Sequence, residues 1–418
     1  MKKILIINAH SSKNKGDAAI IISMIQTIRK FVPNSEITIS SRYPEDDSLY
    51  EEFGCKVVEQ ITRFPSKNLS FIQRLTYLMN ELKTANKFVK GLNIPSVRSN
   101  DIFKCYQESD IIVSCGGGFL YSHPKYHIEA SLIMHLAQIY FATKLNKKVI
   151  LYSQSIGPFR STLSKRVANF VFKKVSRITI REELSRKFLE DIGINNPIVV
   201  GDSAFTMNSS GYDVDVSNLV DINYSKFNVG VTVRQWEFPG KENPKELYKR
   251  YIQSVADTIN HLVKNKIATV YLVPQVTGPT PIEDDRISNK HVLDLLDNDV
   301  RNSVIVMSQD YRPEELKAIY SKFNMFIGTR MHSNIFSLSS MVPTVAIAYE
   351  AKTTGIMKLL DLSKYVLDIN KINSDDLVAT VENCMNNTEI YRKHLNKHIP
   401  LMIEKAEEPA KLIKKMVN

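Results

Sequence analysis

Short apolar, β-branched runs alternate with amphipathic helical stretches along most of the chain, and this alternation constrains the fold more than any other feature. The runs are continuously apolar, which is typical of parallel strands that helices cover on both faces. The pattern predicts an α/β protein with doubly wound parallel sheets. The predicted strands cover 3–8, 110–115, 148–153, 177–180, 197–201, 228–234, 269–274, 303–307, 325–329 and 344–349.

A stretch rich in Asn, Ser, Gly and Asp at 207–227 interrupts this alternation, and 418 residues are too many for one ordinary core. We therefore expect two domains, 1–210 and 225–390, that face each other across a cleft. The segment 60–105 is helical without a strong strand, which predicts an insertion or lid. The residues 391–418 form a helical tail, either an ordinary terminal helix or one that returns to brace the first domain.

Composition narrows the class of protein. Hydrophobic residues make up 43% and charged residues 24%, as in ordinary soluble globular proteins. The opening "MKKILIIN" is too short for a signal peptide, and the four scattered cysteines form no CxxC pair. We therefore expect a cytoplasmic protein with buried thiols.

The formal net charge of +11 has three interpretations. It favours anionic small substrates, it favours contact with the anionic inner face of the cell membrane, or it reflects only a solvated lysine-rich surface. Nucleic acid is not an expected partner, because the basic residues form no compact run and no nucleic-acid-binding motif is present.

Polar motifs recur where predicted strands end, which is the edge of a parallel sheet where ligands bind. The turn "KNKGDAA" places Asn14 and Asp17 just before a helix, where they either cap the helix or bind acceptor hydroxyls. Gly116, Gly117 and Gly118 follow a strand and can expose backbone amides to a ligand. The first motif predicts an acceptor contact or a cap, and the second a binding loop.

Two further motifs follow strands. The loop "YSQSIGPF" carries the hydroxyl and amide groups of Ser153 and Gln154, which suit a neutral polyol or simply form a turn. "VTVRQW" places Arg234 at the end of a strand with apolar flanks, where an unpaired guanidinium is costly. Arg234 is therefore either an anion ligand or part of a structural ion pair, and the neighbouring Trp236 either stacks on a sugar or belongs to the core.

The stretch "FIGTRMHSN" places Arg330, Met331 and His332 where a strand gives way to a helix. An anion at this position would receive the helix N-terminal amides together with the Arg330 and Arg234 guanidinium groups. His332 titrates near neutral pH, as a general acid must. Glu350 and Lys352 end the next strand and are expected at the same rim.

The remaining histidines do not suggest a metal site. His10, His123 and His127 lie near strand ends or in loops, and we expect them on the surface. His135 lies in an apolar helix and is expected in the core. None of them has the HExxH spacing or a comparable metal-binding pattern.

Several of these motifs together resemble the polysaccharide pyruvyl transferase family over roughly 1–390. The pieces, in order, are "NKGDAAI", "DIIVSCGGGFL", "SQSIGPF", "IREELSRKFLEDIG", "GDSAF", "VGVTVR" and "GTRMHSNIFSLSSMVPTVAIAYEAKTTG". The family's arginine on the first strand of the second domain falls on Arg234, and its Arg–Leu–His triplet falls on Arg330, Met331 and His332. Many members have a glycine near the end of strand one, where this chain has Asn8-Ala9-His10.

This resemblance implies a GT-B-like pair of Rossmann-type domains, with the acceptor in the first and phosphoenolpyruvate in the second. It implies transfer of the pyruvyl group from phosphoenolpyruvate onto two hydroxyls of a sugar, giving a ketal and releasing phosphate, without a cofactor. The family's association with capsule and exopolysaccharide assembly implies a lipid-diphosphate-linked glycan as the acceptor. We expect His332 to donate the proton and both arginines to bind the donor, with Asp17 and Glu350 as candidate bases.

Two other functions fit the same sequence. In a nucleotide-sugar glycosyltransferase or epimerase, Glu350 would hold ribose hydroxyls and the Arg–x–His turn would bind a diphosphate. A non-catalytic basic protein would instead dock on the membrane surface or on glycan-assembly machinery.

Overall fold

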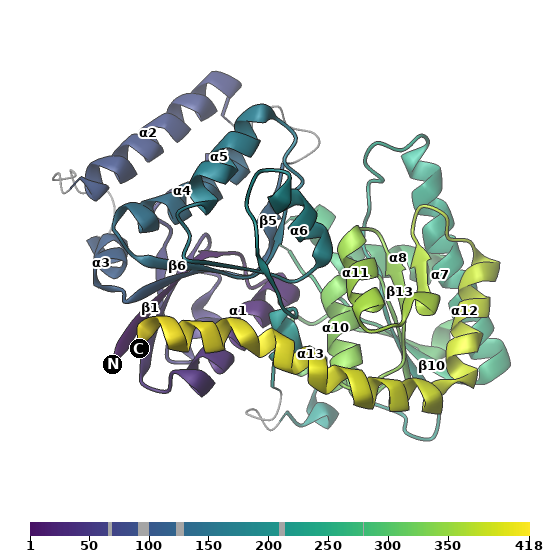
Figure 1. Ribbon diagram of the computed structural model, residues 1–418. Coiled ribbons are helices and arrows are strands. Elements are labelled where there is room, and N and C mark those ends of the chain that lie inside the picture. Colours follow the sequence, from purple (N-terminus) through teal and green to yellow (C-terminus); the bar gives the residue numbers. More distant parts are fainter. Residues whose placement is uncertain (66–68, 91–99, 123–128, 209–213, 279) are drawn as a thin grey trace. The chain divides into compact units, whose positions relative to one another are not determined.

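The computed structural model describes residues 1–418 except 66–68, 91–99, 123–128, 209–213 and 279 (Figure 1). His123, His127 and parts of the predicted insertion 60–105 therefore lie outside the described residues. The chain forms two compact units. The first contains residues 1–12, 20–206 and 404–418, and the second contains 13–19 and 207–403.

This division places the change of unit after Thr206, where the sequence loses its alternation of strands and helices. Two short segments, however, group away from their chain neighbours. Residues 13–19 group with the second unit, and the end of the last helix, from Glu404 onward, groups with the first. A tail that returns to the first domain was one of the two alternatives for 391–418, whereas local sequence patterns do not predict the grouping of 13–19.

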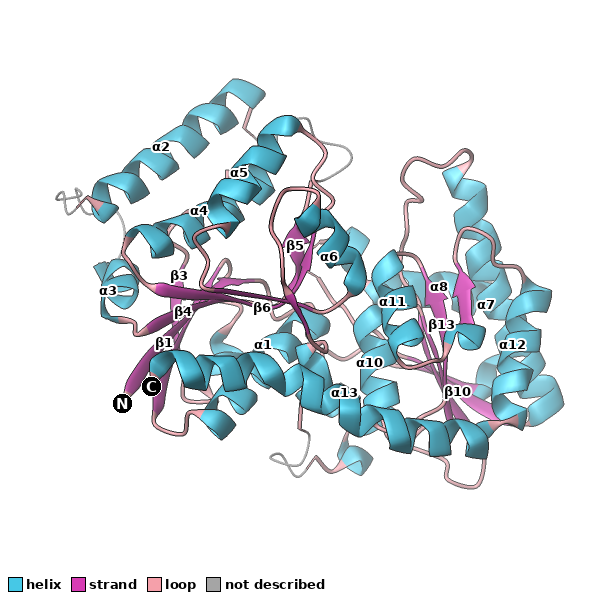
Figure 2. Cartoon of the chain, viewed as in Figure 1, coloured by secondary structure: helices cyan, strands magenta, loops and turns pink. Residues whose placement is uncertain are grey.

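The first unit is built on an eight-stranded parallel sheet in the order β3-β2-β1-β4-β6-β7-β8, with β5 paired to β6 (Figure 2). Its central strands are buried on both faces because every residue from Ile4 to Ile7 is apolar. The strands are β1 (Lys2–Ala9), β2 (Ser35–Ser41), β3 (Lys56–Glu59), β4 (Ile111–Ser114), β5 (Gly117–Leu120), β6 (Lys148–Ile156), β7 (Arg177–Ile180) and β8 (Ile198–Val199).

Helices cover both faces of this sheet (Figure 1). The helices α2, α4 and α5 lie on one face, where Leu5 and Ile7 of β1 join the main apolar cluster. On the other face α1 lies beside the end of α13, and Lys30 forms an ion pair with Glu407 at 2.6 Å. The helices are α1 (Lys15–Phe31), α2 (Phe71–Val89), α3 (Asn100–Glu108), α4 (Ala130–Lys144), α5 (Thr162–Phe172), α6 (Glu183–Glu190) and α13 (Thr388–Val417).

The second unit has a six-stranded parallel sheet in the order β11-β10-β9-β12-β13-β14. The strands are β9 (Phe227–Thr232), β10 (Ala268–Leu272), β11 (Val304–Val306), β12 (Met325–Gly328), β13 (Thr344–Ala348) and β14 (Val366–Asp368). The helices are α7 (Pro244–Lys266), α8 (Asp285–Leu295), α9 (Pro313–Tyr320), α10 (Met331–Ser339), α11 (Ala351–Leu359) and α12 (Ser374–Asn386).

Both sheets have a point at which the strand order reverses. This point lies between β1 and β4 in the first unit and between β9 and β12 in the second. Connections run in opposite directions on either side of such a point, so the strand ends leave a crevice that commonly binds ligands. Within the described residues, no helix has the length and apolar character needed to cross a bilayer.

Candidate active site

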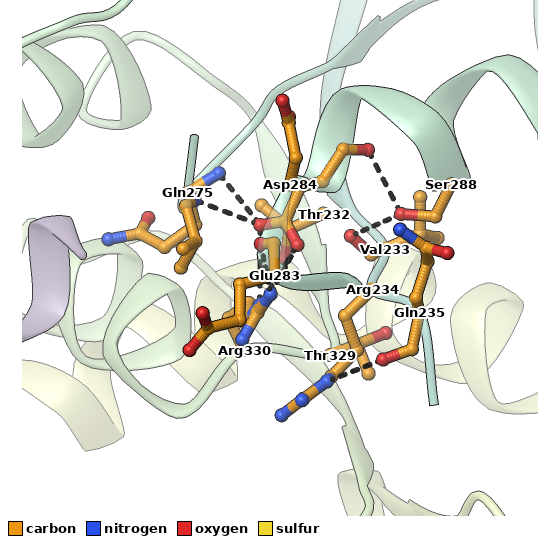
Figure 3. Close-up of polar contacts among 12 residues, drawn as sticks. Thr232, Val233, Arg234, Gln235, Gln275, Glu283, Asp284, Ser288, Thr329 and Arg330 are labelled. Carbon is orange, nitrogen blue, oxygen red and sulfur yellow. Dashed lines mark hydrogen bonds and ion pairs between the residues drawn. The ribbon is translucent and has the colours of Figure 1, made fainter. Parts of the chain in front are cut away.

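The strongest candidate site lies at the reversal point of the second sheet, where β9 and β12 end. These strands pair in register, with Thr232 opposite Gly328, and the N–H of Thr329 donates to the carbonyl of Thr232 at 3.2 Å. Arg234 and Arg330 each follow two residues beyond this last pair. The two arginines therefore begin from equivalent positions on neighbouring strands (Figure 3).

Arg330 forms a buried, two-point ion pair with Asp285, the first residue of α8. Its Nε and Nη2 donate to Oδ1 of Asp285 at 3.0 and 2.6 Å, and Nη2 also donates to the carbonyl of Glu283 at 3.0 Å (Figure 3). Asp285 is fully buried and accepts two more bonds from the backbone N–H groups of Gln275 and Val276. Four donors therefore hold one carboxylate.

Burial and charge oppose each other in this pair. Burial raises the pKa of Asp285 above its usual value even beside Arg330, whereas the charge of Asp285 raises the pKa of Arg330 despite burial of that side chain. We treat the pair as ionised at neutral pH, because a bidentate guanidinium and two backbone N–H groups all stabilise the carboxylate form. Asp285 thus fixes the position of the Arg330 guanidinium.

Arg330 still has donors to offer a ligand. Its residue surface is 9% exposed, and its bonds to Asp285 and Glu283 use Nε and Nη2. Within the described part of the chain, no acceptor bonds to Nη1. The two N–H groups of Nη1 are therefore the ones that can contact an anion, since a guanidinium has five donors in all.

Arg234 is held by aromatic rings. Its guanidinium carbon lies 4.1 Å from the ring centroid of Tyr349 and 4.8 Å from that of Trp236, and Nε donates to the carbonyl of Gln235 at 3.1 Å. The two rings contact each other at 4.8 Å. Among the residues that the structure describes, Arg234 makes no ion pair with a carboxylate. Cation–π contacts thus fix this side chain while leaving both terminal nitrogens for a ligand.

The electrostatic balance at these strand ends favours an anion. The charges of Arg330 and Arg234 both act on the carboxylate of Asp285, so two guanidinium groups share one buried carboxylate. The N-terminus of α10, which begins at Met331, adds backbone amides with partial positive charge. The region can therefore accept an anionic group without an additional counter-charge.

His332 occupies the first turn of α10 and is half-buried. Its ring packs directly on Gly16 of the segment 13–19, which groups with this unit. A Cβ placed on Gly16 would lie 2.1 Å from Nδ1 of His332, closer than any real contact. Met331 is 4% exposed, so its side chain belongs to the core while its backbone begins the helix.

The segment 13–19 is held by its own side chains. Nδ2 of Asn14 donates to Asp17 at 2.8 Å, and Oδ1 of Asn14 accepts from the N–H of Gly16 at 3.1 Å. Asn14 also forms an isolated antiparallel bridge with Val276. Asn14 and Asp17 therefore shape the turn against which His332 packs, which fits the capping interpretation of their sequence pattern.

Glu350 and Lys352 lie where β13 ends, as expected from the sequence. They form an ion pair with each other at 2.7 Å, and Glu350 is exposed. Tyr349, which contacts Arg234, immediately precedes Glu350. The two charged residues thus lie in the chain segment next to the arginine site.

The remaining predicted residues belong to the first unit and are largely used within it. Gly116 and Gly117 are buried, whereas Gly118 is exposed. Ser153 is 1% exposed, and its hydroxyl donates to the carbonyl of Gly201. Gln154 is fully buried and donates to the carbonyl of Gly117 at 2.8 Å. Ser153 and Gln154 therefore each donate a hydrogen bond to a backbone carbonyl of their own unit.

Sequence reasoning missed two residues that organise the arginine site. Asp285 lies in "IEDDR", where nothing in the local pattern distinguishes a buried carboxylate from exposed ones. Tyr349 directly follows β13, and a partner for its ring could not be assigned from the sequence. Among the described residues, no group of three or more His, Cys, Asp or Glu side chains is arranged to hold a metal ion.

Comparison with solved structures shows which class of fold this is. The chain matches UDP-GlcNAc 2-epimerase from Neisseria meningitidis with a TM-score of 0.62 and 13% identity, covering 99% of each chain. It matches a glycosyltransferase from Rickettsia africae with a TM-score of 0.59 and 12% identity, covering 100% of this chain and 98% of the other. These similarities confirm the predicted GT-B-like α/β fold with two Rossmann-type units.

The family follows from sequence comparison. The family model for polysaccharide pyruvyl transferase matches residues 14–351, which include Arg234, Asp285, Arg330 and His332. The chain therefore belongs to the polysaccharide pyruvyl transferase family, as the sequence motifs indicated. It is also 26% identical over 398 residues to the amylovoran biosynthesis protein AmsJ of Erwinia amylovora, covering 93% of each chain.

Proposed function

We propose that this protein transfers the pyruvyl group of phosphoenolpyruvate onto two hydroxyls of a sugar in polysaccharide biosynthesis, forming a pyruvate ketal and releasing phosphate. Family membership supports pyruvyl transfer, and the arginine site supports phosphoenolpyruvate as the donor. The observation that carries the proposal is the equivalent placement of Arg234 and Arg330 around one shared carboxylate, Asp285, beside the helix that begins at Met331.

In this proposal the two arginines bind the two anionic groups of the donor. Nη1 of Arg330 and the terminal nitrogens of Arg234 contact the phosphate and the carboxylate, and the amides of α10 add to the positive field. Because Asp285 and the aromatic rings already fix both guanidinium groups, little side-chain entropy is lost when the donor binds.

His332 then supplies the proton that starts the reaction. Protonation of the methylene carbon develops positive charge on the neighbouring carbon, which the first sugar hydroxyl attacks. The proton of this hydroxyl passes to a carboxylate base, for which Asp17 and Glu350 are the candidates, and His332 recovers a proton from that base. Cleavage of the bond from this carbon to the phosphate oxygen releases phosphate. The second hydroxyl attacks the resulting oxocarbenium carbon and closes the ketal, and its proton goes to the departing phosphate. Neither electrons nor protons are needed from a cofactor.

We further propose that the acceptor is a lipid-diphosphate-linked glycan reached from the anionic inner surface of the cell membrane. On α5, Leu163 and Phe170 are 65% and 52% exposed, and lysine and arginine side chains around them are also exposed. Phe170 lines an apolar groove of about 420 Å³ between α2, α4 and α5. Exposed apolar groups surrounded by cations suit a surface of anionic lipid.

A ligand-binding experiment distinguishes phosphoenolpyruvate from a nucleotide sugar as the donor substrate. The protein is incubated with phosphoenolpyruvate and, separately, with UDP-sugars, and its thermal unfolding midpoint is followed. We expect phosphoenolpyruvate alone to raise the midpoint, with a smaller rise for Arg234→Lys. A rise with UDP-sugars and none with phosphoenolpyruvate would instead support a nucleotide-sugar enzyme.

A further inference from the structure

In the first unit, several polar side chains contain enclosed atoms that make no hydrogen bond with any described residue. The group, which we name the buried polar cluster, contains His10, Gln60, Thr62, His135 and Gln138. Within the described residues, no partner bonds to Nε2 of either histidine, Oε1 of Gln60, Oγ1 of Thr62 or either side-chain polar atom of Gln138. Gln60, Thr62, His135 and Gln138 are each at most 4% exposed, whereas His10 is half-buried with its Nε2 enclosed.

Such a concentration of unsatisfied groups needs a physical explanation. Native proteins leave few buried polar atoms without a partner, because each one loses its bond to water and gains nothing in return. Thr27, by contrast, is equally buried, and its hydroxyl contacts both the carbonyl of Ser23 and the hydroxyl of Thr206. Single buried atoms elsewhere in this unit, such as the hydroxyls of Ser23 and Tyr106, also lack a partner among the described residues, so what distinguishes the cluster is its position.

The cluster lies where this type of sheet binds ligands. His10 follows β1 directly, at the reversal point between β1 and β4, and Gln60 follows β3. Gln60 and Thr62 line a cavity of about 390 Å³ together with Arg42, Tyr43 and Phe64. The position at the end of the parallel strands and the cavity are observed independently of the unpaired polar atoms. All three observations indicate the same part of the first unit as a ligand site.

Aromatic rings connect the two histidines to this cavity. Phe64, which lines the cavity, has its ring centroid 5.3 Å from that of His135. The His10 and His135 rings lie 5.2 Å apart, and Phe119 contacts both at 4.8 and 4.6 Å. His10, which the sequence led us to expect on the surface, thus packs among rings with its Nε2 enclosed.

The hydrogen bonds of Asn8 fix the protonation of His135. Nδ2 of Asn8 donates to the hydroxyl of Ser114 at 3.2 Å and to the carbonyl of His135 at 3.4 Å. Its Oδ1 then faces Nδ1 of His135 at 3.1 Å, so Nδ1 must carry the hydrogen. Nε2 is left as an acceptor without a hydrogen, and it needs a donor.

The cluster is also uncharged at neutral pH. Burial, with a further contribution from Arg42, lowers the pKa of His10 to about 4. Burial followed by the charges of His10 and Arg42 lowers the pKa of His135 well below its usual value. The cavity is also lined by Arg42 and by the ion pair of Arg63 with Glu59. Imidazole, amide and hydroxyl groups beside aromatic rings suit a ligand that is rich in O–H donors and partly apolar, which describes a sugar ring.

We propose that the cavity at the buried polar cluster binds the hydroxyl groups of the sugar acceptor, with Gln60 Oε1 and Thr62 Oγ1, whose residues line it, accepting from them. The identification of this sugar as the pyruvyl acceptor rests on the proposed function, whereas binding of a sugar does not. Asn14, Asp17, Ser153 and Gln154, the acceptor contacts expected from the sequence, have bonds within their own units and are not part of this site.

Two isosteric substitutions test the site with little disturbance of the fold. Thr62→Val and Gln138→Leu, combined in one double variant, remove only groups that lack a partner. We expect the thermal midpoint to stay the same or rise, because unsatisfied buried groups are removed. The matched control Thr27→Val removes a hydroxyl that is bonded, and its midpoint should fall. A fall for the double variant as large as that of the control would contradict the proposal.

Sugar binding is measured directly, without phosphoenolpyruvate. Saturation-transfer NMR with methyl glucoside, methyl galactoside and methyl mannoside should show binding of at least one of them to the wild type and to Thr27→Val. Binding should be at least tenfold weaker in the double variant. Absence of binding to the wild type, or equal binding by the double variant, would overturn the proposal and would mean that the cluster holds only water.

The same experiment separates this proposal from the proposed function. If glycosides bind at the cluster but no pyruvyl group is transferred from phosphoenolpyruvate, the sugar site stands and the donor assignment fails. If pyruvyl transfer occurs and the double variant keeps the wild-type KM for its acceptor, the donor assignment stands and the sugar site fails. The KM for phosphoenolpyruvate should be unchanged in the double variant.

Discussion

Arg330 donates from both Nε and Nη2 to Oδ1 of the fully buried Asp285, at 3.0 and 2.6 Å. Because of this ion pair, a substitution of Arg330 affects the stability of the fold as well as the binding of a ligand. Removing Arg330 removes a ligand contact and also leaves a buried carboxylate without its counter-charge, so loss of activity in such a variant does not by itself show that Arg330 binds substrate.

We predict that Arg330→Met lowers the free energy of unfolding by about 3–5 kcal/mol, the usual cost of breaking a buried pair from one side. The double variant Arg330→Met/Asp285→Asn should recover part of this loss, because Asn is neutral and can still accept from the backbone of Gln275 and Val276. Urea unfolding of both proteins measures the difference. A single variant that loses less than about 1 kcal/mol would contradict the pairing.

Arg234 offers a cleaner test of donor binding, since its side chain is held by rings rather than by a carboxylate. Arg234→Lys should fold normally and raise the KM for phosphoenolpyruvate at least tenfold, because lysine lacks the planar guanidinium that stacks on Tyr349 and donates at two points. The exposed Arg250, whose side chain bonds only to the carbonyl of Asn370 among the described residues, provides the control Arg250→Lys. Equal KM values for both variants would exclude Arg234 from the donor site.

Gly16 gives a test of His332 that leaves the histidine in place. A Cβ on Gly16 would lie 2.1 Å from Nδ1 and 2.5 Å from Cγ of His332, so Gly16→Ala must displace the ring. We expect kcat to fall by at least tenfold while the KM for phosphoenolpyruvate changes little. In the control Gly278→Ala the nearest atom is 3.5 Å away, an ordinary contact, and activity should be retained. Full activity of Gly16→Ala would show that the ring position does not matter.

The enclosed ring nitrogens of His10 and His135 predict that the stability of the fold is sensitive to acid. The folded-state pKa of His10 is lowered to about 4 from 6.5, so the unfolded chain binds more protons between these values. Stability from this group is therefore complete above pH 6.5 and is lost as the pH falls toward 4, by up to about 3 kcal/mol. His135 acts in the same direction.

Urea unfolding from pH 7 to pH 4 measures this loss, and His10→Gln should reduce its slope. The matched variant His291→Gln, which changes an exposed histidine outside the cluster, is measured beside it. If His10→Gln and the wild type lose stability in parallel, the His10 ring is not enclosed as described.

Membrane contact predicts sedimentation with anionic vesicles. The protein should bind vesicles that contain phosphatidylglycerol but not those of phosphatidylcholine alone, and Leu163→Ser/Phe170→Ser should weaken binding several-fold. Tyr224, 72% exposed in the second unit, gives the control Tyr224→Ser. Equal binding by both variants would remove α5 from the contact surface.

The sequence predicted the fold well where burial is complete. Continuous apolar runs such as "ILII" in β1 and "TVAIA" in β13 are buried on both faces, and they were recognised as parallel strands. The strands β2, β3, β5 and β14 were not predicted, because "SEITISS" and "KVVE" mix polar with apolar residues and the other two are short or rich in glycine. Local periodicity is weak in such segments.

Only those residues of the candidate site that directly follow a predicted strand could be recognised from the sequence. Arg234 and Arg330 were recognised because each follows an apolar strand. The partner of Arg330 lies 45 residues away at the start of α8, and the glycine beneath His332 belongs to the first turn of α1. Such pairings depend on tertiary packing between distant segments, which a single sequence does not specify.

Mass spectrometry of the product tests the central claim most directly. Lipid-linked glycans are incubated with the protein and with phosphoenolpyruvate labelled with ¹³C in all three pyruvyl carbons, beside a parallel reaction with His332→Ala. We predict that the wild type adds one labelled pyruvyl ketal to a glycan and releases one phosphate for each ketal. His332→Ala should bind phosphoenolpyruvate but form no ketal. Ketal formation by His332→Ala at the wild-type rate, or transfer of a sugar from a UDP-sugar instead of labelled pyruvate, would contradict the account.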